Sequence, residues 1–150
     1  MNLLVELAGI NSLFLDTAPV IYFIEAHPQY GPLMKDIVDS FKSGALEAYT
    51  SVITITEVLP KPVSQNKTHL VETFMRFLKN EVNLNLLNIS PEIAESAGHL
   101  RAKYNSLRTM DAIQLSAAIK AEVDIFVTND IKLKQVTEVR VIVLNDYVSG

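Results

Sequence analysis

The chain has 150 residues, of which 49% are hydrophobic and 20% are charged, and its formal net charge is −4. This length and composition are typical of a folded protein with a real core, so we expect a single domain over residues 1–150. The chain contains no cysteine, which excludes disulfides, thiolate zinc sites, iron–sulfur clusters and cysteine nucleophiles. Its negative charge argues against a protein that binds nucleic acid only by neutralising phosphates. It does not argue against an enzyme whose acids hold a cation.

The first residues of the chain are apolar, but they contain Glu6, lack Lys and Arg, and are too short to span a membrane. We interpret residues 1–12 as a short N-terminal extension. We therefore expect a cytoplasmic protein that has no membrane segment.

Short apolar runs of strand length alternate along the chain with longer segments of helical pattern. The runs cover residues 13–15, 45–49, 84–89, 125–127 and 141–144. Apolar residues recur at helical spacing in residues 32–41, 70–78 and 93–104, and the mostly apolar residues 110–122 predict a buried helix. Ser90 and Pro91 are typical of a helix start. Strands that alternate with helices predict an α/β fold whose parallel sheet is covered on both faces.

Two aspartates follow apolar runs of the predicted sheet. Asp16 comes directly after residues 13–15, and Asp130 comes after residues 125–129. Because ligands of open parallel sheets bind at the carboxyl ends of the strands, both carboxylates are candidates for one site. Each aspartate alone is explained equally well as the N-cap of the helix that follows it, and the two roles can coexist.

Two further acids are candidates for the same site. Asp111 lies in the first turn of the helix predicted over residues 110–122, in a stretch otherwise free of charge, where a carboxylate needs a partner. Glu57 lies in residues 51–60, whose β-branched run locally favours a strand. If Ser51 caps a helix there instead, Glu57 lies near the end of that helix. For Glu57 alone, a solvated surface position is the simpler interpretation.

Four carboxylates that converge on one site repel one another. At an effective dielectric constant of about 20 and a separation of about 5 Å, each pair costs roughly 3 kcal/mol. Such a cluster therefore needs a cation or raised pKa values. Oxygen ligands without cysteine suit Mg²⁺ or Mn²⁺, whose usual task is phosphate chemistry.

Four segments of the chain resemble, in order, the four motifs of PIN domains. They are residues 13–17, 50–58, 110–118 and 126–130, and the likeness spans about residues 13–144. Within that family the chain is most similar to the VapC-type ribonuclease toxins of prokaryotic toxin–antitoxin pairs. Each motif is short, but four of them in order, at strand ends and helix starts, are far more specific than any one.

The resemblance implies a three-layer α/β/α domain with a central, mostly parallel five-stranded sheet. It also implies an endoribonuclease that depends on Mg²⁺ or Mn²⁺. The acids that would bind the metal and carry catalysis are Asp16, Glu57, Asp111 and Asp130. Positions beside those acids are matched by Thr17, Thr128, Ser51 and Asn129. We expect Asp16 and Asp111 to be direct ligands, and leave open whether Glu57 and Asp130 bind directly, bind through water or orient the nucleophile.

The resemblance also implies partners. VapC-type toxins are homodimers that act on RNA, and each is neutralised by a small antitoxin protein encoded beside it. Residues 1–12 depart from the many relatives that begin almost at the first strand, and an added helix would account for them. Arg108 and Lys132, close in sequence to Asp111 and Asp130, are candidate phosphate contacts, although ordinary solvated charges are the simpler interpretation.

Other functions lack their sequence signals. The three histidines have no close ligand spacing, and the chain has no serine-hydrolase elbow, Walker loop or dinucleotide-binding glycine motif. A phosphatase with an aspartyl nucleophile is disfavoured, because the second Asp expected two positions after Asp16 is Ala18. Two alternatives stay open: a PIN-fold protein that acts on DNA flaps or structured RNA, and a catalytically silent protein-binding module.

Overall fold

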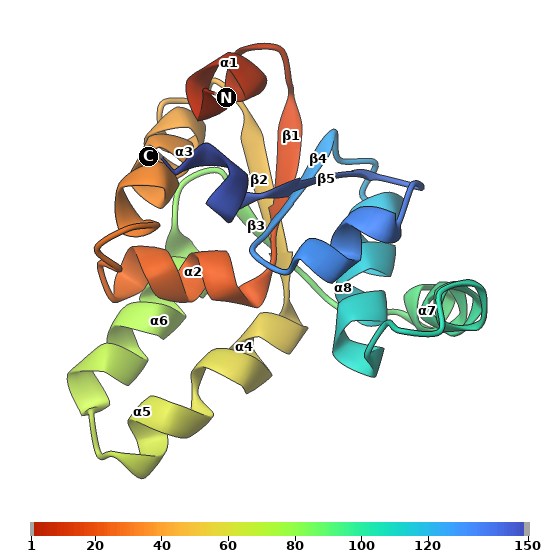
Figure 1. The fold of residues 1–150 in the computed structure, drawn as a ribbon. Helices are drawn as coiled ribbons and strands as arrows, with labels where there is room; N and C mark the ends of the chain where they lie inside the picture. Colours follow the sequence, from red (N-terminus) through yellow and green to blue (C-terminus); the bar gives the residue numbers. More distant parts are fainter. Residues whose placement is uncertain (1, 149–150) are drawn as a thin grey trace.

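A computed structural model of the protein describes residues 2–148 and contains a five-stranded sheet. Its strands are β1 (Ser12–Leu15), β2 (Glu47–Ser51), β3 (Leu84–Leu87), β4 (Ile125–Thr128) and β5 (Arg140–Val143). Their order is β3-β2-β1-β4-β5, and every neighbouring pair is parallel (Figure 1). The predicted α/β fold with a parallel sheet is confirmed. From β1 the chain adds β2 and β3 on one side and β4 and β5 on the other, so the topological switch point lies between β1 and β4.

Helices cover both faces of the sheet. The structure contains α1 (Leu3–Ala8), α2 (Thr17–Ile24), α3 (Gly31–Lys42), α4 (Val52–Val58), α5 (Pro60–Ser64), α6 (Thr68–Asn80), α7 (Pro91–Lys103), α8 (Thr109–Lys120) and the 3-10 helices η1 (Ile131–Gln135) and η2 (Leu144–Tyr147). Helices α2, α3 and α6 lie on one side of the sheet, and α7 and α8 lie on the other (Figure 1). The domain therefore has the three α/β/α layers that the resemblance implies.

Alternation of side chains along the central strands builds two cores. Leu13 and Leu15 of β1 pack against α2, α3 and α6, whereas Phe14 between them packs against α7 and α8. Phe126 of β4 points to the same side as Phe14, and the two stacked rings have centroids 5.4 Å apart. Because both faces of β1 and β4 are buried, the backbone at their carboxyl ends is firmly held.

The N-terminal extension is partly helical. Residues 3–8 form α1, whose Leu3 and Leu7 are buried in the core shared with α3, and Glu6 forms an ion pair with Arg140 of β5. Over residues 2–148 the structure has no helix with the length and apolar character that crossing a membrane requires.

The strands β1, β4 and β5 agree with their apolar runs to within one residue, whereas β2 and β3 differ from theirs by two residues at one end or both. In the run 45–49, the strand starts only at Glu47, after a turn in which Gly44 has a φ of +87°. In the run 84–89, the strand ends at Leu87, and Ser90 then accepts a hydrogen bond from the backbone N–H of Ile93 at 3.2 Å as the predicted N-cap of α7.

The β-branched run after β2 is a helix and not a strand. Ser51 ends β2, and its hydroxyl oxygen accepts a hydrogen bond from the backbone N–H of Ile53 at 3.1 Å, which caps α4. Tertiary packing and the cap outweigh the strand preference of the β-branched side chains. Glu57 consequently lies in the last turn of α4, as expected if Ser51 caps a helix.

Candidate active site

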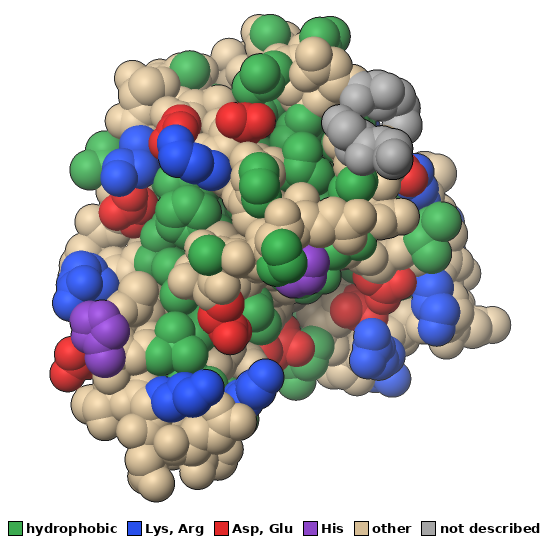
Figure 2. Space-filling model, turned by 60° about the vertical axis from the view of Figure 1, so that its left-hand side comes forward, with side chains coloured by type: hydrophobic (Ala, Val, Ile, Leu, Met, Phe, Trp, Pro, Cys, Tyr) green, Lys and Arg blue, Asp and Glu red, His purple; other side chains and the backbone are tan. Residues whose placement is uncertain are grey.

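The carboxyl ends of β1 and β4 open into a pocket of about 660 Å³. This acidic pocket is lined by all four candidate acids, Asp16, Glu57, Asp111 and Asp130, and by Arg108 and Lys132. It lies at the switch point of the sheet, where open parallel sheets bind their ligands. A second pocket, of about 450 Å³, lies between α2 and α3 and is lined mainly by apolar side chains. Figure 2 shows hydrophobic side chains gathered on the face of α2, α3 and α6, with charged side chains around them. Of these two pockets, the acidic pocket is the one that brings four carboxylates together.

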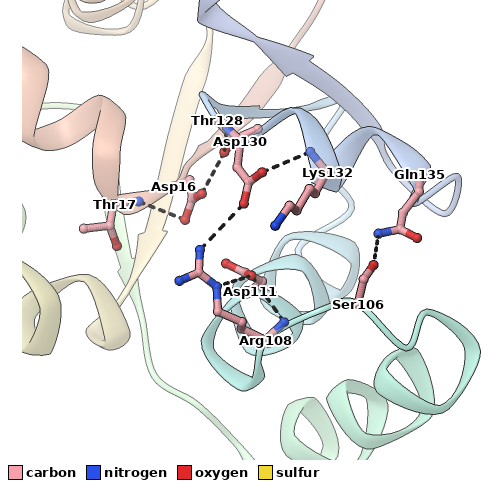
Figure 3. A network of polar contacts seen from close by, with 9 residues as sticks. All are labelled: Asp16, Thr17, Ser106, Arg108, Asp111, Thr128, Asp130, Lys132 and Gln135. Carbon is pink, nitrogen blue, oxygen red and sulfur yellow. Dashed lines mark hydrogen bonds and ion pairs between the residues drawn. The ribbon is translucent and has the colours of Figure 1, made fainter.

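Asp16 is held from two sides at the end of β1. One carboxylate oxygen accepts a hydrogen bond from the backbone N–H of Thr17 at 2.9 Å, so Asp16 is the N-cap of α2. The other oxygen accepts a hydrogen bond from the hydroxyl of Thr128 at 2.8 Å (Figure 3). The capping role and the placement in the pocket coexist, and together they fix the orientation of this carboxylate.

Asp130 follows β4 and is coupled to Asp16 through Thr128. The backbone N–H of Asp130 donates to the Thr128 hydroxyl at 3.1 Å, and the Asp130 carboxylate accepts from the backbone N–H of Lys132 at 3.0 Å. Asp130 is thus the N-cap of the short 3-10 helix η1. One threonine side chain sets the positions of the two acids that end neighbouring strands.

Asp111 enters the pocket from the first turn of α8. One of its carboxylate oxygens lies 3.5 Å from Nε of Arg108, and the same guanidinium group reaches a carboxylate oxygen of Asp130 at 3.8 Å (Figure 3). The Arg108 side chain is 82% exposed, so it bridges the two acids from the solvent side. From the sequence, Arg108 was a candidate phosphate contact, with a solvated charge as the simpler interpretation; in the structure its guanidinium group pairs with two acids.

Glu57 reaches the pocket from the last turn of α4. The hydroxyl of Thr17 donates a hydrogen bond to its carboxylate at 2.6 Å. Thr17 therefore contacts Asp16 through its backbone and Glu57 through its side chain. This bond directs the Glu57 carboxylate toward the end of β1, while the residue as a whole stays exposed to solvent.

The acids share a pocket but are more widely spaced than the sequence predicts. Within residues 2–148, no three Asp, Glu or His side chains stand close enough together, as placed, to hold one ion. Arg108 accounts for part of this spacing, because its contacts with Asp111 and Asp130 draw both carboxylates toward the guanidinium group. The donor set itself fits Mg²⁺ or Mn²⁺, since it consists of carboxylate oxygens only. Binding one ion would require Asp111 and Asp130 to turn from Arg108 toward Asp16.

The electrostatics of the pocket favour a cation. Burial raises the pKa of Asp16 to about 6 from an ordinary value of 3.8, and the negative charges of Asp111 and Glu57 add to the rise. Hydrogen bonds from Thr128 and Thr17 act in the opposite direction. A divalent cation beside Asp16 would stabilise its ionised form and offset this repulsion.

Of the other residues predicted to lie near the acids, Asn129 and Lys132 line the pocket and Ser51 does not. Asn129 donates from its amide to the Tyr22 hydroxyl at 3.1 Å and accepts from the backbone N–H of Asn145 at 2.9 Å, which holds the loop that carries Asp130. Lys132 lines the pocket beside Asp130. Ser51 does not line the pocket but is fully buried beneath it, where its hydroxyl donates to the side chain of Gln114.

The family model that describes the PIN domain matches residues 13–139 of this chain. The chain belongs to the PIN domain family. All four acids and both cations of the pocket fall within the matched residues, whereas α1 precedes them. No curated protein matches the sequence.

Solved structures share the fold of this PIN domain. VapBC2 from Rickettsia felis, bound to a DNA fragment from their promoter, is 22% identical with a TM-score of 0.66 and covers 87% of this chain and 97% of its own. A toxin–antitoxin complex from Klebsiella pneumoniae is 23% identical with a TM-score of 0.65, and the match covers 88% of this chain and 97% of that one. VapC20 from Mycobacterium tuberculosis, a toxin that cleaves the sarcin–ricin loop, is 11% identical with a TM-score of 0.62, with 76% and 86% covered.

Several polar residues around the pocket of this PIN domain were not predicted from the sequence. They are Thr50, Thr54, Gln114 and Asn145. The first three lie in segments whose local pattern predicts only packing. A polar side chain such as Gln114, inside an apolar helix, was the one available signal.

Proposed function

We propose that this protein is a metal-dependent endoribonuclease of the VapC type, which hydrolyses RNA phosphodiester bonds in the acidic pocket. The observation that carries the proposal is the presence of four carboxylates from four separate elements in one pocket at the switch point of a PIN fold. The pKa of Asp16, which burial raises, supports the proposal because carboxyl groups with perturbed pKa values gather at functional sites.

Asp16, Asp111, Asp130 and Glu57 would hold Mg²⁺ or Mn²⁺. A bound divalent ion supplies a Lewis acid that activates water and stabilises charge developing on the phosphodiester. The hydrogen bonds from Thr17 and Thr128 hold Asp16 in a fixed orientation for this task. Thr17 orients Glu57 at the same time.

Arg108 and Lys132 supply positive charge at the mouth of the pocket. The exposed guanidinium of Arg108 pairs with Asp111 and Asp130 in the structure, and it would be available to an RNA phosphate if those two carboxylates held a metal ion instead. A role of Arg108 as a phosphate contact is therefore compatible with the ion pairs it makes here.

The structural relatives support the proposed partners. Two of the similar structures are a VapBC protein and a toxin–antitoxin complex, and one is a toxin that cleaves the sarcin–ricin loop. We therefore propose that this chain is the toxin of such a pair, neutralised by a small antitoxin, and that it acts as a cytoplasmic homodimer. The mass of the purified chain in light scattering tests whether it is a dimer. Arrest of cell growth when the chain is expressed without an antitoxin tests whether it is a toxin.

Cleavage assays test the activity and the substrate. Purified protein is incubated with single-stranded RNA, structured RNA and a DNA flap, in Mn²⁺ or in EDTA. We expect cleavage of RNA in Mn²⁺ only, and loss of at least 100-fold in Asp111→Asn, on the order seen when a main catalytic group is removed. Cleavage of the flap alone would shift the function to DNA processing. Undiminished RNA cleavage by Asp111→Asn would refute the assignment.

A further inference from the structure

Gln114 is a buried amide in the middle of α8. It lies one turn after Asp111 and is 1% exposed, among the apolar residues that pack α8 against the sheet. An amide in such a position is costly unless its oxygen and its nitrogen both find partners. The contacts of this side chain therefore indicate what it is used for.

Both ends of the Gln114 amide bond to residues next to or within α4. Its oxygen accepts a hydrogen bond from the hydroxyl of Ser51, the residue that caps α4. Its nitrogen donates to the hydroxyl of Thr54, in the first turns of α4, at 2.8 Å. Ser51 and Thr54 are themselves fully buried. The helix of Asp111 is thus bonded directly to the helix of Glu57.

The hydrogen bonds continue from Thr54 to the end of β1. The Thr50 hydroxyl donates to the backbone carbonyl of Leu15 at 2.9 Å and lies 3.0 Å from the Thr54 hydroxyl. Because a hydroxyl has only one hydrogen, Thr50 must accept from Thr54, and Thr54 in turn accepts from Gln114. The resulting chain of bonds runs in one direction, from Gln114 to the residue that precedes Asp16.

This buried chain therefore joins the elements that carry three of the four acids. Asp111 lies on α8 with Gln114, Glu57 lies on α4 with Thr54, and Asp16 follows Leu15. Gln114 contacts none of these carboxylates, but its hydrogen bonds connect the elements that carry them. Networks of this kind, when every member is paired, favour one arrangement of the surrounding backbone.

We infer that Gln114 is a positioning residue that sets the spacing between Asp111, Glu57 and Asp16 and thereby the affinity of the pocket for a divalent cation. The inference rests on the proposed function. Residues that orient metal-binding groups typically contribute roughly 10- to 100-fold in metal affinity or activity. A residue that serves only to stabilise the fold would leave the affinity of the folded protein unchanged.

The test measures binding of Mn²⁺ alone, by electron paramagnetic resonance, to the whole chain and to Gln114→Met. The matched control is Ser116→Ala, because Ser116 is also buried on α8 and its hydroxyl lacks a hydrogen-bond partner among the described residues. We expect Mn²⁺ affinity to fall roughly tenfold or more in Gln114→Met and to stay within about twofold in the control. A folded Gln114→Met protein with wild-type Mn²⁺ affinity would overturn the inference.

A second variant covers the case in which Gln114→Met does not fold. The double variant Gln114→Met with Thr54→Val replaces both partners of a buried hydrogen bond by apolar groups of similar shape, which costs much less stability than removing one. We expect it to fold and to bind Mn²⁺ as weakly as the single variant. Wild-type affinity in the folded double variant would equally overturn the inference. If the wild-type protein itself binds no Mn²⁺, the proposed function is refuted. That result differs from wild-type affinity in either variant, which would overturn only the role of Gln114.

Discussion

The hydroxyl of Thr128 donates a hydrogen bond to the carboxylate of Asp16 at 2.8 Å. The hydroxyl oxygen of Thr128 also accepts a hydrogen bond from the backbone N–H of Asp130. One side chain on β4 therefore couples the acids at the ends of two neighbouring strands. The geometry of the acidic pocket thus depends on a residue that is itself buried and uncharged.

Replacing Thr128 by Val tests this coupling. The hydrogen bond from Thr128 lowers the pKa of Asp16, so its loss should raise that pKa above the present value of about 6. The acid limb of the pH profile of RNA cleavage should then move to higher pH, and stability at neutral pH should fall by about 1–3 kcal/mol. The control is Thr73→Val, whose hydroxyl bonds only within its own helix. An unchanged acid limb would argue against the coupling.

The raised pKa of Asp16 also predicts how stability depends on pH. The carboxyl titrates near 3.8 when unfolded and near 6 when folded, so between these values the folded state binds more protons. Raising the pH through this window should therefore destabilise the fold, by up to about 3 kcal/mol for this group.

Asp16→Asn should remove that penalty. In urea unfolding with EDTA, we expect the variant to be about 1–3 kcal/mol more stable than the wild type at pH 7, and nearly equal to it below pH 4. Glu95→Gln, on the exposed face of α7, serves as the control for loss of one negative charge. A variant that is less stable than the wild type at pH 7 would contradict the electrostatic account.

The guanidinium group of Arg108 competes with a metal ion for the carboxylates of Asp111 and Asp130 in the proposed site. Its ion pairs with Asp111 and Asp130 must be broken when a metal ion binds, so Arg108→Gln should bind Mn²⁺ several-fold more tightly. Stability should change by less than about 1 kcal/mol, because the side chain is 82% exposed. If Arg108 also contacts phosphate, the KM for RNA should rise in the same variant. Arg101→Gln on α7 is the control, and weaker Mn²⁺ binding by Arg108→Gln would exclude the competition.

We expect the helix α1 to contribute to stability and not to the chemistry, because it packs into the core by Leu3 and Leu7. Leu7 is 6% exposed and packs into the core, whereas Leu4 on the same helix is 53% exposed. Leu7→Ala should cost about 2–4 kcal/mol in urea unfolding, and Leu4→Ala should cost less than about 1 kcal/mol. Both folded variants should cleave RNA at the wild-type rate. Equal losses of stability would show that α1 is not docked as described.

Local signals predicted much of the fold. The apolar run before Asp16 and the cap at Ser90 specify a strand end and a helix start from adjacent residues, and both are found where expected. The run after Ser51 was ambiguous, because its β-branched residues favour a strand while Ser51 favours a helix start. Only the packing of the folded chain decides between the two.

The hydrogen bonds and ion pairs within the site could not be predicted from the sequence. Gln114 bonds to Ser51 and Thr54, which are 63 and 60 residues away, and no local pattern encodes such a contact. The bridge that Arg108 forms between two acids likewise depends on how α8 and η1 approach each other. Asp16, Asp111 and Asp130 were predictable because each follows a strand or begins a helix, whereas Glu57 rested on the family resemblance.

In the proposed function, the four acids together form one divalent-cation site. Titration of the purified wild-type chain with Mn²⁺, followed by electron paramagnetic resonance, measures whether that site exists. We expect saturable binding that is lost in Asp16→Asn and in Asp111→Asn and retained in Glu95→Gln. A wild-type chain that binds no Mn²⁺, or acid variants that bind it as tightly as the wild type, would show that the acids do not form such a site.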